Sequence, residues 1–421
     1  MKTNEKDTKQ GIVPALRFPE FQNAGEWVYL EGNKVFEQIS NRKHNSNLPI
    51  LAISQEHGAV PRDLIDYKVI VSDEGIENYK VVGVGDFIIS LRSFQGGIEY
   101  SAYNGICSPA YIILRKRLDV DNQFFKYYFK SRTFIRDLNK NLEGIRDGKM
   151  VSYKQFSEIL LPIPSIHNKK EQQRIADCLS SIDALIKAAE NKIEELQAHK
   201  KGLMQQLFPA EGETVPALRF PEFQNAGEWT KISLGELTYK VSKKNKAGKL
   251  YPIYSINNKQ GFIRQEEQFT GVDSNDRGYD LSLYSIVGSK TFAYNPARIN
   301  VGSIGYSGEL KDVIISSLYV CFKTSETVND EFLLKYFETE SFKKAVLNSV
   351  EGGIRSYLFY DNFAKINLYL PPNYDIAEQQ KIADCLSSVD DLIMAQTNRL
   401  EALRSHKKGL MQQLFPNINE C

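Results

Sequence analysis

The sequence predicts two α/β (α+β) domains, present as two copies of a pseudo-two-fold tandem repeat and joined by two long helices that form an antiparallel coiled coil. Three observations predict this fold: a repeated segment before each domain, a heptad pattern after each domain, and strand-like runs separated by turns in between. The chain has 421 residues, of which 25% are charged and 42% hydrophobic, a composition typical of folded multidomain proteins.

Two segments are repeated almost letter for letter. Val13–Trp27 reads VPALRFPEFQNAGEW and recurs unchanged as Val215–Trp229; we call these segments the heads. The tails begin EQQRIADCLSSIDALI at Glu171 and EQQKIADCLSSVDDLI at Glu378, and both end in HKKGLMQQLFP. The middles, residues 28–168 and 230–375, diverge over most of their length. A constant frame with variable middles favours recognition of two different targets in one geometry, and simple drift after duplication is the alternative.

The tails carry the heptad pattern of a coiled coil, bracketed by prolines before and after each helix. The first helix, taken from residue 172 to 207, would be about 54 Å long. A pseudo-two-fold axis between the copies requires the two helices to run antiparallel. Lys200 and Lys407 fall in the seam, where a lysine either fixes the register or lies at a solvated helix end. The predicted seam residues are Ile175, Leu179, Ile182, Ile186, Ile193, Leu196, Leu203 and Leu207, then Ile382, Leu386, Val389, Ile393, Leu400, Leu403, Leu410 and Leu414.

The repeat divides the chain into six parts. The predicted parts are an N-terminal tail (1–12), a first domain (13–168), a first helix (169–209), a second domain (210–375, with a linker at 210–216), a second helix (376–416) and a C-terminal tail (417–421).

Each middle is predicted to be a mixed α/β domain. Runs rich in β-branched and aromatic residues predict strands near residues 86–90, 110–114, 284–287 and 317–322, and helices follow at about 122–140 and 330–348. The stretch from Arg115 to Lys154 holds 11 basic and 5 acidic residues, a local excess of six positive charges. This excess favours a surface that contacts phosphates, and a solvated helix flank is the alternative.

The sequence contains no motif that predicts catalysis. It lacks a G-x-x-x-x-G-K-[ST] phosphate loop, its five histidines have no metal-ligand or triad spacing, and no zinc or disulfide pattern links its five cysteines. Pro371-Pro372-Asn-Tyr374 is similar to an adenine methyltransferase motif only superficially, because Leu370 stands where a polar residue should hold the adenine. We therefore expect a cytoplasmic, non-enzymatic recognition protein with no bound metal.

The layout and the repeated motifs resemble the specificity subunit of bacterial type I restriction-modification enzymes over nearly the whole chain. The marks are the two EQQ(R/K)IADCLSS(I/V)D helix starts, the two HKKGLMQQLFP ends and the two LRFPEF…EW heads. The resemblance implies that each middle is a target-recognition domain reading one half of a split DNA sequence, with the helices setting the spacer.

The resemblance also implies partners and cofactors. Double-stranded DNA, two methyltransferase (modification) subunits and restriction/translocase subunits would bind this chain, with no membrane involved. S-adenosylmethionine, ATP and Mg would be bound by the partner subunits, with no cofactor in this chain. The alternatives are a coiled-coil scaffold with two protein-binding modules and no DNA role, and, less favoured by the missing motifs, a self-sufficient methyltransferase.

Family members tend to place base contacts on loops between strands, and arginine, glutamine and asparagine suit bidentate pairing with bases. For any one of these residues an ordinary surface role is the alternative. Arg146 and Arg355 are favoured because a Gly-Ile-Arg element recurs in both middles. The predicted DNA-binding residues are Gln55, His57, Arg92, Ser93, Gln95, Arg146 and Lys149 in the first domain, and Asn257, Asn258, Lys259, Gln260, Lys290, Tyr294, Asn295, Arg298 and Arg355 in the second.

Overall fold

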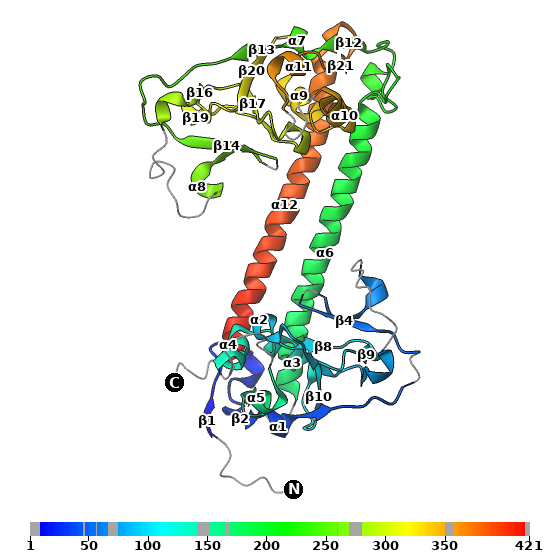
Figure 1. Cartoon of the computed structure of the whole chain (residues 1–421), viewed down its shortest axis with the longest axis vertical. Helices are drawn as coiled ribbons and strands as arrows, with labels where there is room; N and C mark the ends of the chain where they lie inside the picture. The colour runs from blue at the N-terminus through cyan, green and yellow to red at the C-terminus, as the bar shows by residue number, and fades with distance from the viewer. Residues whose placement is uncertain are drawn as a thin grey trace. The chain divides into compact units, whose positions relative to one another are not determined.

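The chain folds into two compact units, seen in the computed structural model of Figure 1. Unit 1 comprises residues 1–190 and 398–421, and unit 2 comprises residues 191–397. Each unit therefore combines one middle with a part of both tail helices. The structure describes residues 9–44, 47–55, 57–65, 75–140, 151–164, 169–258, 260–268, 280–349 and 357–416.

The two middles contain most of the same elements in the same order. The first middle, with the strand before it, has β1 (Lys9–Ile12), β2 (Trp27–Glu31), α1 (Gly32–Val35), β3 (Phe36–Ile39), β4 (Leu51–Ser54), β5 (Gly58–Pro61), β6 (Lys80–Val82), β7 (Phe87–Ile89), α2 (Ser93–Gly96), β8 (Glu99–Tyr100), β9 (Gly105–Cys107), β10 (Ile112–Lys116), α3 (Asn122–Tyr128), α4 (Arg132–Lys140), α5 (Tyr153–Ser157) and β11 (Leu160–Ile163).

The second middle has no counterpart of β1 among its described residues. Its elements are β12 (Thr230–Ser233), α7 (Leu234–Leu237), β13 (Thr238–Val241), β14 (Ile253–Asn257), β15 (Gly261–Arg264), α8 (Gln265–Gln268), β16 (Ser285–Val287), β17 (Phe292–Tyr294), the 3₁₀ turn η8 (Ile299–Val301), β18 (Ile304–Tyr306), β19 (Val313–Ile315), β20 (Val320–Thr324), α9 (Asp330–Tyr336), α10 (Glu340–Ser349), α11 (Tyr360–Phe363) and β21 (Asn367–Leu370).

A four-stranded antiparallel sheet forms the centre of each middle. Its order is β3-β10-β7-β8 in unit 1 and β13-β20-β17-β18 in unit 2. All three residues of β7 and all three of β17 are buried, as expected for short apolar strands covered on both faces. Beside this sheet lies a hairpin, β4–β5 in unit 1 and β14–β15 in unit 2. The two domains thus share the central sheet and the hairpin although their sequences diverge, but in unit 2 the hairpin belongs to a four-stranded sheet of order β15-β14-β19-β16.

The predicted helices at 122–140 and 330–348 are each two helices, not one. α3 and α4 are separated at Ser131, and α9 and α10 at Thr339. The hydroxyl of Ser131 accepts a hydrogen bond from Phe134 N at 3.2 Å, and that of Thr339 accepts one from Phe342 N at 3.2 Å. A side chain that satisfies a free amide in this way begins a new helix, so the break follows from local capping.

The tails form α6 (Lys170–Leu207) and α12 (Ile376–Leu414). In unit 1 the start of α6 packs with the end of α12, so Ile175 and Leu179 share a core with Leu410 and Leu414. In unit 2 the end of α6 packs with the start of α12 around Leu207 and Leu386. The paired segments run antiparallel in unit 1, where Asp183 contacts Lys407 and Glu190 contacts Arg404. Every predicted seam residue is buried or half-buried.

The two seam lysines form ion pairs and do not lie at solvated helix ends. Lys407 bonds Asp183 and lies over the ring of Tyr127, with its Nζ 5.3 Å from the ring centroid. Lys200, at the equivalent position, bonds Asp390 at 2.7 Å and also pairs with Glu338. Burial by itself would lower the pKa of Lys200, but these two carboxylates outweigh burial and raise that pKa. The polar positions of the seam therefore join each helix pair to its domain.

Each head is clamped onto the tails. Arg17 makes two hydrogen bonds to Glu171, at 2.7 and 2.8 Å, and Arg219 makes the same two bonds to Glu378. The backbone amide of Leu16 donates to the carbonyl of Gln413 at 3.0 Å, and Leu218 repeats this contact with the carbonyl of Gln206. These buried, bidentate contacts explain why heads and tails are constant together.

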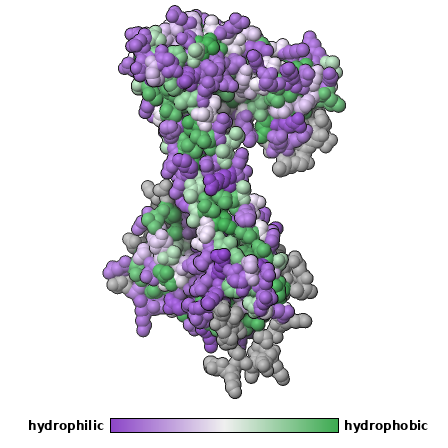
Figure 2. All heavy atoms as spheres, turned by 180° about the vertical axis from the view of Figure 1, so that it is seen from behind, coloured by the Kyte–Doolittle hydropathy of each residue, from purple (hydrophilic) through white to green (hydrophobic). Residues whose placement is uncertain are grey.

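The surface shown in Figure 2 is a mixture of hydrophilic and hydrophobic residues, with hydrophobic ones visible on the helical segments as well as on the domains. Among the residues that the structure describes, no helix is both long enough and apolar enough to cross a membrane.

Candidate nucleic-acid interface

Two of the loops predicted to bind DNA in the first domain lie against each other. The side-chain amide of Gln55, in the β4–β5 turn, donates to the carbonyl of Arg92 at 3.0 Å. Gln55 also lies directly over Gly96, since a Cβ built on that glycine would be 2.5 Å from Gln55 Cδ. A larger residue at this position would require the Gln55 side chain to move. The hairpin turn and the short helix α2 therefore form one surface.

The exposed side chains on this surface are Gln55, His57, Arg92 and Gln95. Ser93 differs from them, because it is 1% exposed and its hydroxyl accepts a hydrogen bond from Ser90 N at 2.9 Å. Its predicted base contact is not supported by this position, and the bond to Ser90 gives it a structural role in the turn before α2.

A partly buried ion pair supports α2. Lys130 donates to the carbonyl of Gly96 at 3.0 Å and bonds the carboxylate of Glu99, which is 2% exposed. Burial raises the pKa of Glu99, and Lys130 opposes that rise. Asn139, near the end of α4, donates to the carbonyl of Phe94 at 2.7 Å. α2 is thus held in place by Lys130 and Asn139, which are not among the residues predicted from the sequence to form the site.

In the second domain the β14–β15 turn occupies the same place as the β4–β5 turn. Asn257 Oδ1 accepts a hydrogen bond from Gln260 N at 2.6 Å, and Asn258 and Gln260 are exposed. The loop after β17 contacts this hairpin, because Ser303 donates to the carbonyl of Ile256 at 2.9 Å. Gly261 has a φ of +66°, and its Cβ position would lie 3.1 Å from the Cα of Gly305.

Asn295 and Arg298 lie on the loop between β17 and β18. Asn295 Oδ1 accepts a hydrogen bond from Ala297 N at 3.0 Å, and Arg298 is exposed. The carbonyl of the intervening Pro296 accepts a hydrogen bond from Leu358 N at 3.0 Å. This bond brings the chain that follows residues 350–356 next to the loop.

Two predicted residues of the second domain lie elsewhere. Tyr294 is fully buried, its hydroxyl donates to the carbonyl of Leu358 at 3.1 Å, and its ring stacks on Phe363. Burial raises the pKa of this phenol, and the side chain does not reach the surface. Lys290 is exposed but precedes β17, and its backbone amide donates to the carbonyl of Gly308. It therefore stands at the opposite end of the strand from Asn295.

Four predicted residues fall outside the described residues: Arg146, Lys149, Lys259 and Arg355. Their flanks are described. Lys140 ends α4 next to Asn139, which contacts the α2 turn, and Tyr357 resumes the chain beside Leu358, which contacts Pro296. In both domains a described residue that flanks the segment, Asn139 in the first and Leu358 in the second, therefore contacts the stretch that follows the central strand.

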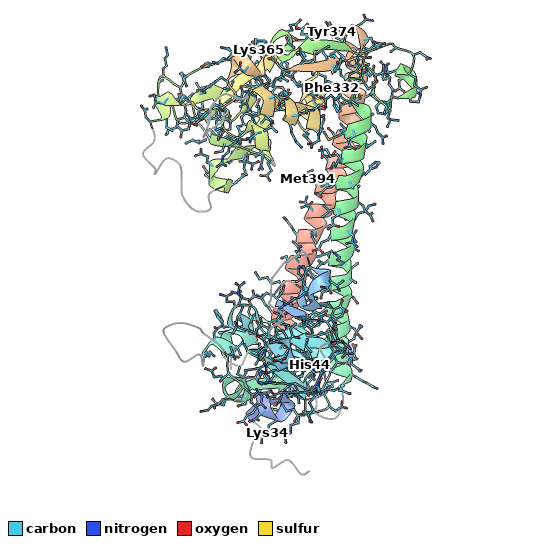
Figure 3. All side chains as sticks on the ribbon, turned by 45° about the vertical axis from the view of Figure 1, so that its right-hand side comes forward. Lys34, His44, Phe332, Lys365, Tyr374 and Met394 are labelled. Atoms are coloured by element: carbon cyan, nitrogen blue, oxygen red, sulfur yellow. The ribbon has the colours of Figure 1, made fainter. Side chains whose placement is uncertain are left out.

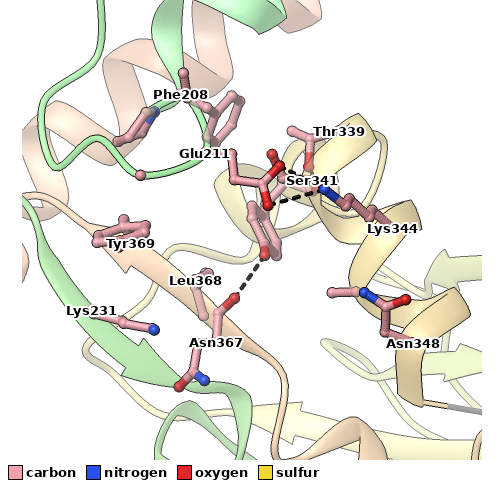
Figure 4. Close-up of a pocket in the computed structure, with 15 residues that line it drawn as sticks. Phe208, Glu211, Lys231, Thr339, Ser341, Lys344, Asn348, Asn367, Leu368 and Tyr369 are labelled. Atoms are coloured by element: carbon pink, nitrogen blue, oxygen red, sulfur yellow. Dashed lines mark hydrogen bonds and ion pairs between the residues drawn. The ribbon is translucent and has the colours of Figure 1, made fainter.

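Two pockets occur in unit 2. The larger is a groove of about 1280 Å³ that lies between the helices and the exposed residues Asn258 and Gln260. The smaller, of about 400 Å³, lies where α6 ends (Figure 4). Lys344 bonds Glu211 across its mouth at 2.7 Å, and Tyr336 donates to the carbonyl of Asn367 at 3.0 Å. No predicted DNA-binding residue lines the smaller pocket.

The chain is similar to known specificity proteins over most of its length. The family model of the type I restriction modification DNA specificity domain matches the chain twice, over residues 20–198 and 226–404. The specificity subunit of the type I restriction enzyme MjaVIII of Methanocaldococcus jannaschii is 25% identical over 355 residues, covering 80% of this chain and 79% of that protein. Another protein of that organism, described as the specificity subunit of type I restriction enzyme MjaX, is 23% identical over 437 residues, covering 98% and 96%.

Solved structures show the same fold. The S subunit of the type I restriction-modification system of M. genitalium superposes with a TM-score of 0.55 at 15% identity, covering 97% of this chain and all of that one. A chain from a structural study of complex assembly and conformational transition in a type I R-M system gives a TM-score of 0.54 at 13% identity, covering 92% and 97%. The chain belongs to the type I restriction modification DNA specificity family and is a specificity subunit with two target-recognition domains.

Proposed function

We propose that each recognition domain reads one half of a bipartite DNA sequence through its hairpin turn and the loop after its central strand. The observation that supports this most is that the two domains bring the same pair of loops together. In both domains, whose sequences differ, the same two loops meet and carry exposed glutamine, asparagine or arginine. Each of these side chains can form two hydrogen bonds with the edge of one base. Such bidentate pairing distinguishes bases in the major groove.

We further propose that α6 and α12 set the distance between the half-sites. α6 has 38 residues and α12 has 39, so each would be about 57 Å long. Neither helix contains a proline, so no residue of that kind interrupts its hydrogen bonds. A stiff connection of this length suits a spacer of roughly one DNA turn or somewhat more.

The proposed role needs no chemistry from this chain. Methyl transfer to adenine N6 would be carried out by two modification subunits that bind S-adenosylmethionine, and cleavage by restriction/translocase subunits that use ATP and Mg. A subunit that reads chromosomal DNA would act in the cytoplasm. We propose a non-catalytic chain that supplies only target choice and assembly.

Exposed apolar residues at equivalent positions in the two copies support two identical partners. Val13 and Val215 are 51% and 42% exposed, and Leu185 and Leu392 are 46% and 54% exposed. Folding does not require leucine at a solvated helix position, yet both copies keep it. Leu185→Asp and Leu392→Asp should each reduce the modification subunits that co-purify with the full chain. Leu347→Asp is the control, since Leu347 is 62% exposed and Asn139 stands at its equivalent position.

Mapping of N6-methyladenine across the genome, in cells with and without this gene, tests the function directly. The expected result is a split motif that disappears on deletion and returns when the gene is restored. If a demonstrably expressed modification subunit leaves methylation unchanged by the deletion, the DNA role fails and a scaffold becomes the better description.

A further inference from the structure

The groove in unit 2 is lined both by residues of the long helices and by the β14–β15 turn that is proposed to read bases. α6 contributes Gln197, Lys201 and Gln205, which are spaced four residues apart and so lie on one stripe of the helix. All three are exposed. Asn258 and Gln260 of the β14–β15 turn also line the groove, as does Met394 of α12, which is labelled in Figure 3.

Lysines neutralise the acidic groups of the groove. Asp390 bonds both Lys200 and Lys335, at 2.7 and 2.6 Å, and Glu338 pairs with Lys200. Glu340 is bonded by Lys343 at 2.8 Å. Lys201 forms no ion pair with any residue that the structure describes. Lys201 does act on Glu340, since it adds to the larger effect of Lys343 in lowering the pKa of that carboxyl. The groove therefore keeps one exposed ammonium group that has no ion pair among the described residues, flanked by the side-chain amides of Gln197 and Gln205.

The stripe recurs in the second copy. Arg404, Lys408 and Gln412 occupy the equivalent positions on α12 in unit 1 and are also exposed. Arg404 bonds Glu190 at 2.7 Å, so Lys408 is the counterpart of Lys201 in both position and exposure. No acidic residue occupies any of the six positions. A row of ammonium, guanidinium and amide donors without carboxylates suits a phosphate chain.

We infer that these stripes bind the sugar-phosphate backbone of DNA, Lys201 beside the half-site read by the second domain and Lys408 beside the half-site read by the first. This inference rests on the proposed DNA-reading function. A strand whose bases meet Asn258 and Gln260 would place its phosphates against the wall of α6. The helices would thus position DNA as well as space the domains, with no preference for sequence.

The test measures DNA binding by the full chain, with any modification subunits that co-purify, as a function of salt concentration. One duplex contains the motif found by methylation mapping and a second contains the same bases scrambled. Lys201→Gln should reduce the slope of log affinity against log salt by about 0.9, which is the value for one lost phosphate contact. The double variant with Lys408→Gln should lose about twice that. Affinity for both duplexes should fall by the same factor.

Lys192→Gln is the matched control, because Lys192 is exposed on the same helix but does not line the groove. It should leave the slope at the wild-type value. If Lys201→Gln keeps the wild-type slope while the wild type still prefers the motif, the stripe does not contact DNA. If Lys201→Gln changes the preference between duplexes instead, the residue reads bases and the inference is wrong. A wild-type chain with no preference for the motif would overturn the proposed function itself.

Discussion

Units 1 and 2 hold their heads by the same arginine clamp but hold their tails by different bonds. Arg17–Glu171 and Arg219–Glu378 match bond for bond. At the helix start, however, Tyr127 donates to Asp183 in unit 1, whereas Lys335 donates to Asp390 in unit 2. A residue of the middle that contacts the constant helices can therefore differ between the copies, provided that it still donates a hydrogen bond to the equivalent aspartate.

The charges around these two aspartates are also balanced in both units. In unit 1 the cluster is Lys407 with Asp183 and a neutral Tyr127, while in unit 2 it is Lys200 and Lys335 with Asp390 and Glu338. Each cluster is neutral overall. The constant frame therefore imposes a local charge balance on whichever middle it carries.

The largest effect is expected from the clamps. Arg219→Ala leaves Glu378 buried without its cation and should reduce the free energy of unfolding of unit 2 by about 3–5 kcal/mol. Arg17→Ala should cost less in unit 1, because Trp27 Nε1 still donates to Glu171 at 3.2 Å. Denaturant titration can resolve the two units, since Trp27 and Trp229 are the only tryptophans and each unit contains one. An equal or larger loss in Arg17→Ala would show that the Trp27 bond gives no compensation.

The reading loops should show the next effect. Arg298→Ala is expected to relax one base position in one half-site, and Arg92→Ala one position in the other, each by about 1–3 kcal/mol of discrimination. Methylation motifs in cells that carry each variant measure this directly. Ser93→Ala provides a contrast, because its buried hydroxyl serves the turn. If both arginine variants altered the same half-site, the assignment of one domain to each half would be wrong.

The fold could be predicted further than the site. The heptads and the repeat predicted the helices and the doubled topology because a strong period survives any tertiary context. It was harder to predict which residues of a strand reach the surface. Tyr294 precedes Asn295 and was predicted to bind DNA, yet β17 is buried on both faces. The contact of Gln55 with Gly96 joins residues far apart in sequence, and no local pattern encodes it. In the sequence Lys130 is only one of the charges in the basic stretch Arg115–Lys154, and its buried partner Glu99 lies in no distinguishing motif.

A charge exchange tests the balance of the helix clusters. Tyr127→Lys leaves two cations against Asp183, and Lys335→Tyr leaves one cation against Asp390 and Glu338. Each should lower the free energy of unfolding by about 1–2 kcal/mol, a modest value because the aspartates are partly exposed. Adding Glu338→Gln to Lys335→Tyr restores neutrality and should recover most of the loss. A double variant no more stable than Lys335→Tyr would mean that packing, and not charge, decides which residue is accepted there.

The smallest expected effect is the difference in stability cost between replacing Trp27 and replacing Trp229. Trp27 Nε1 donates to Glu171, but Trp229 Nε1 has no hydrogen-bond partner among the described residues, although both rings are buried in equivalent cores. Phenylalanine removes a similar volume from each core, so the two substitutions should share a packing cost. Trp27→Phe should lose about 1 kcal/mol more than Trp229→Phe, near the lower end for a bond to a charged group, because Arg17 already satisfies Glu171. The remaining tryptophan reports only the unmutated unit, so circular dichroism must follow the mutated one. Equal costs would mean that the identical heads are also energetically identical, and that the bond to Glu171 adds nothing to the Arg17 clamp.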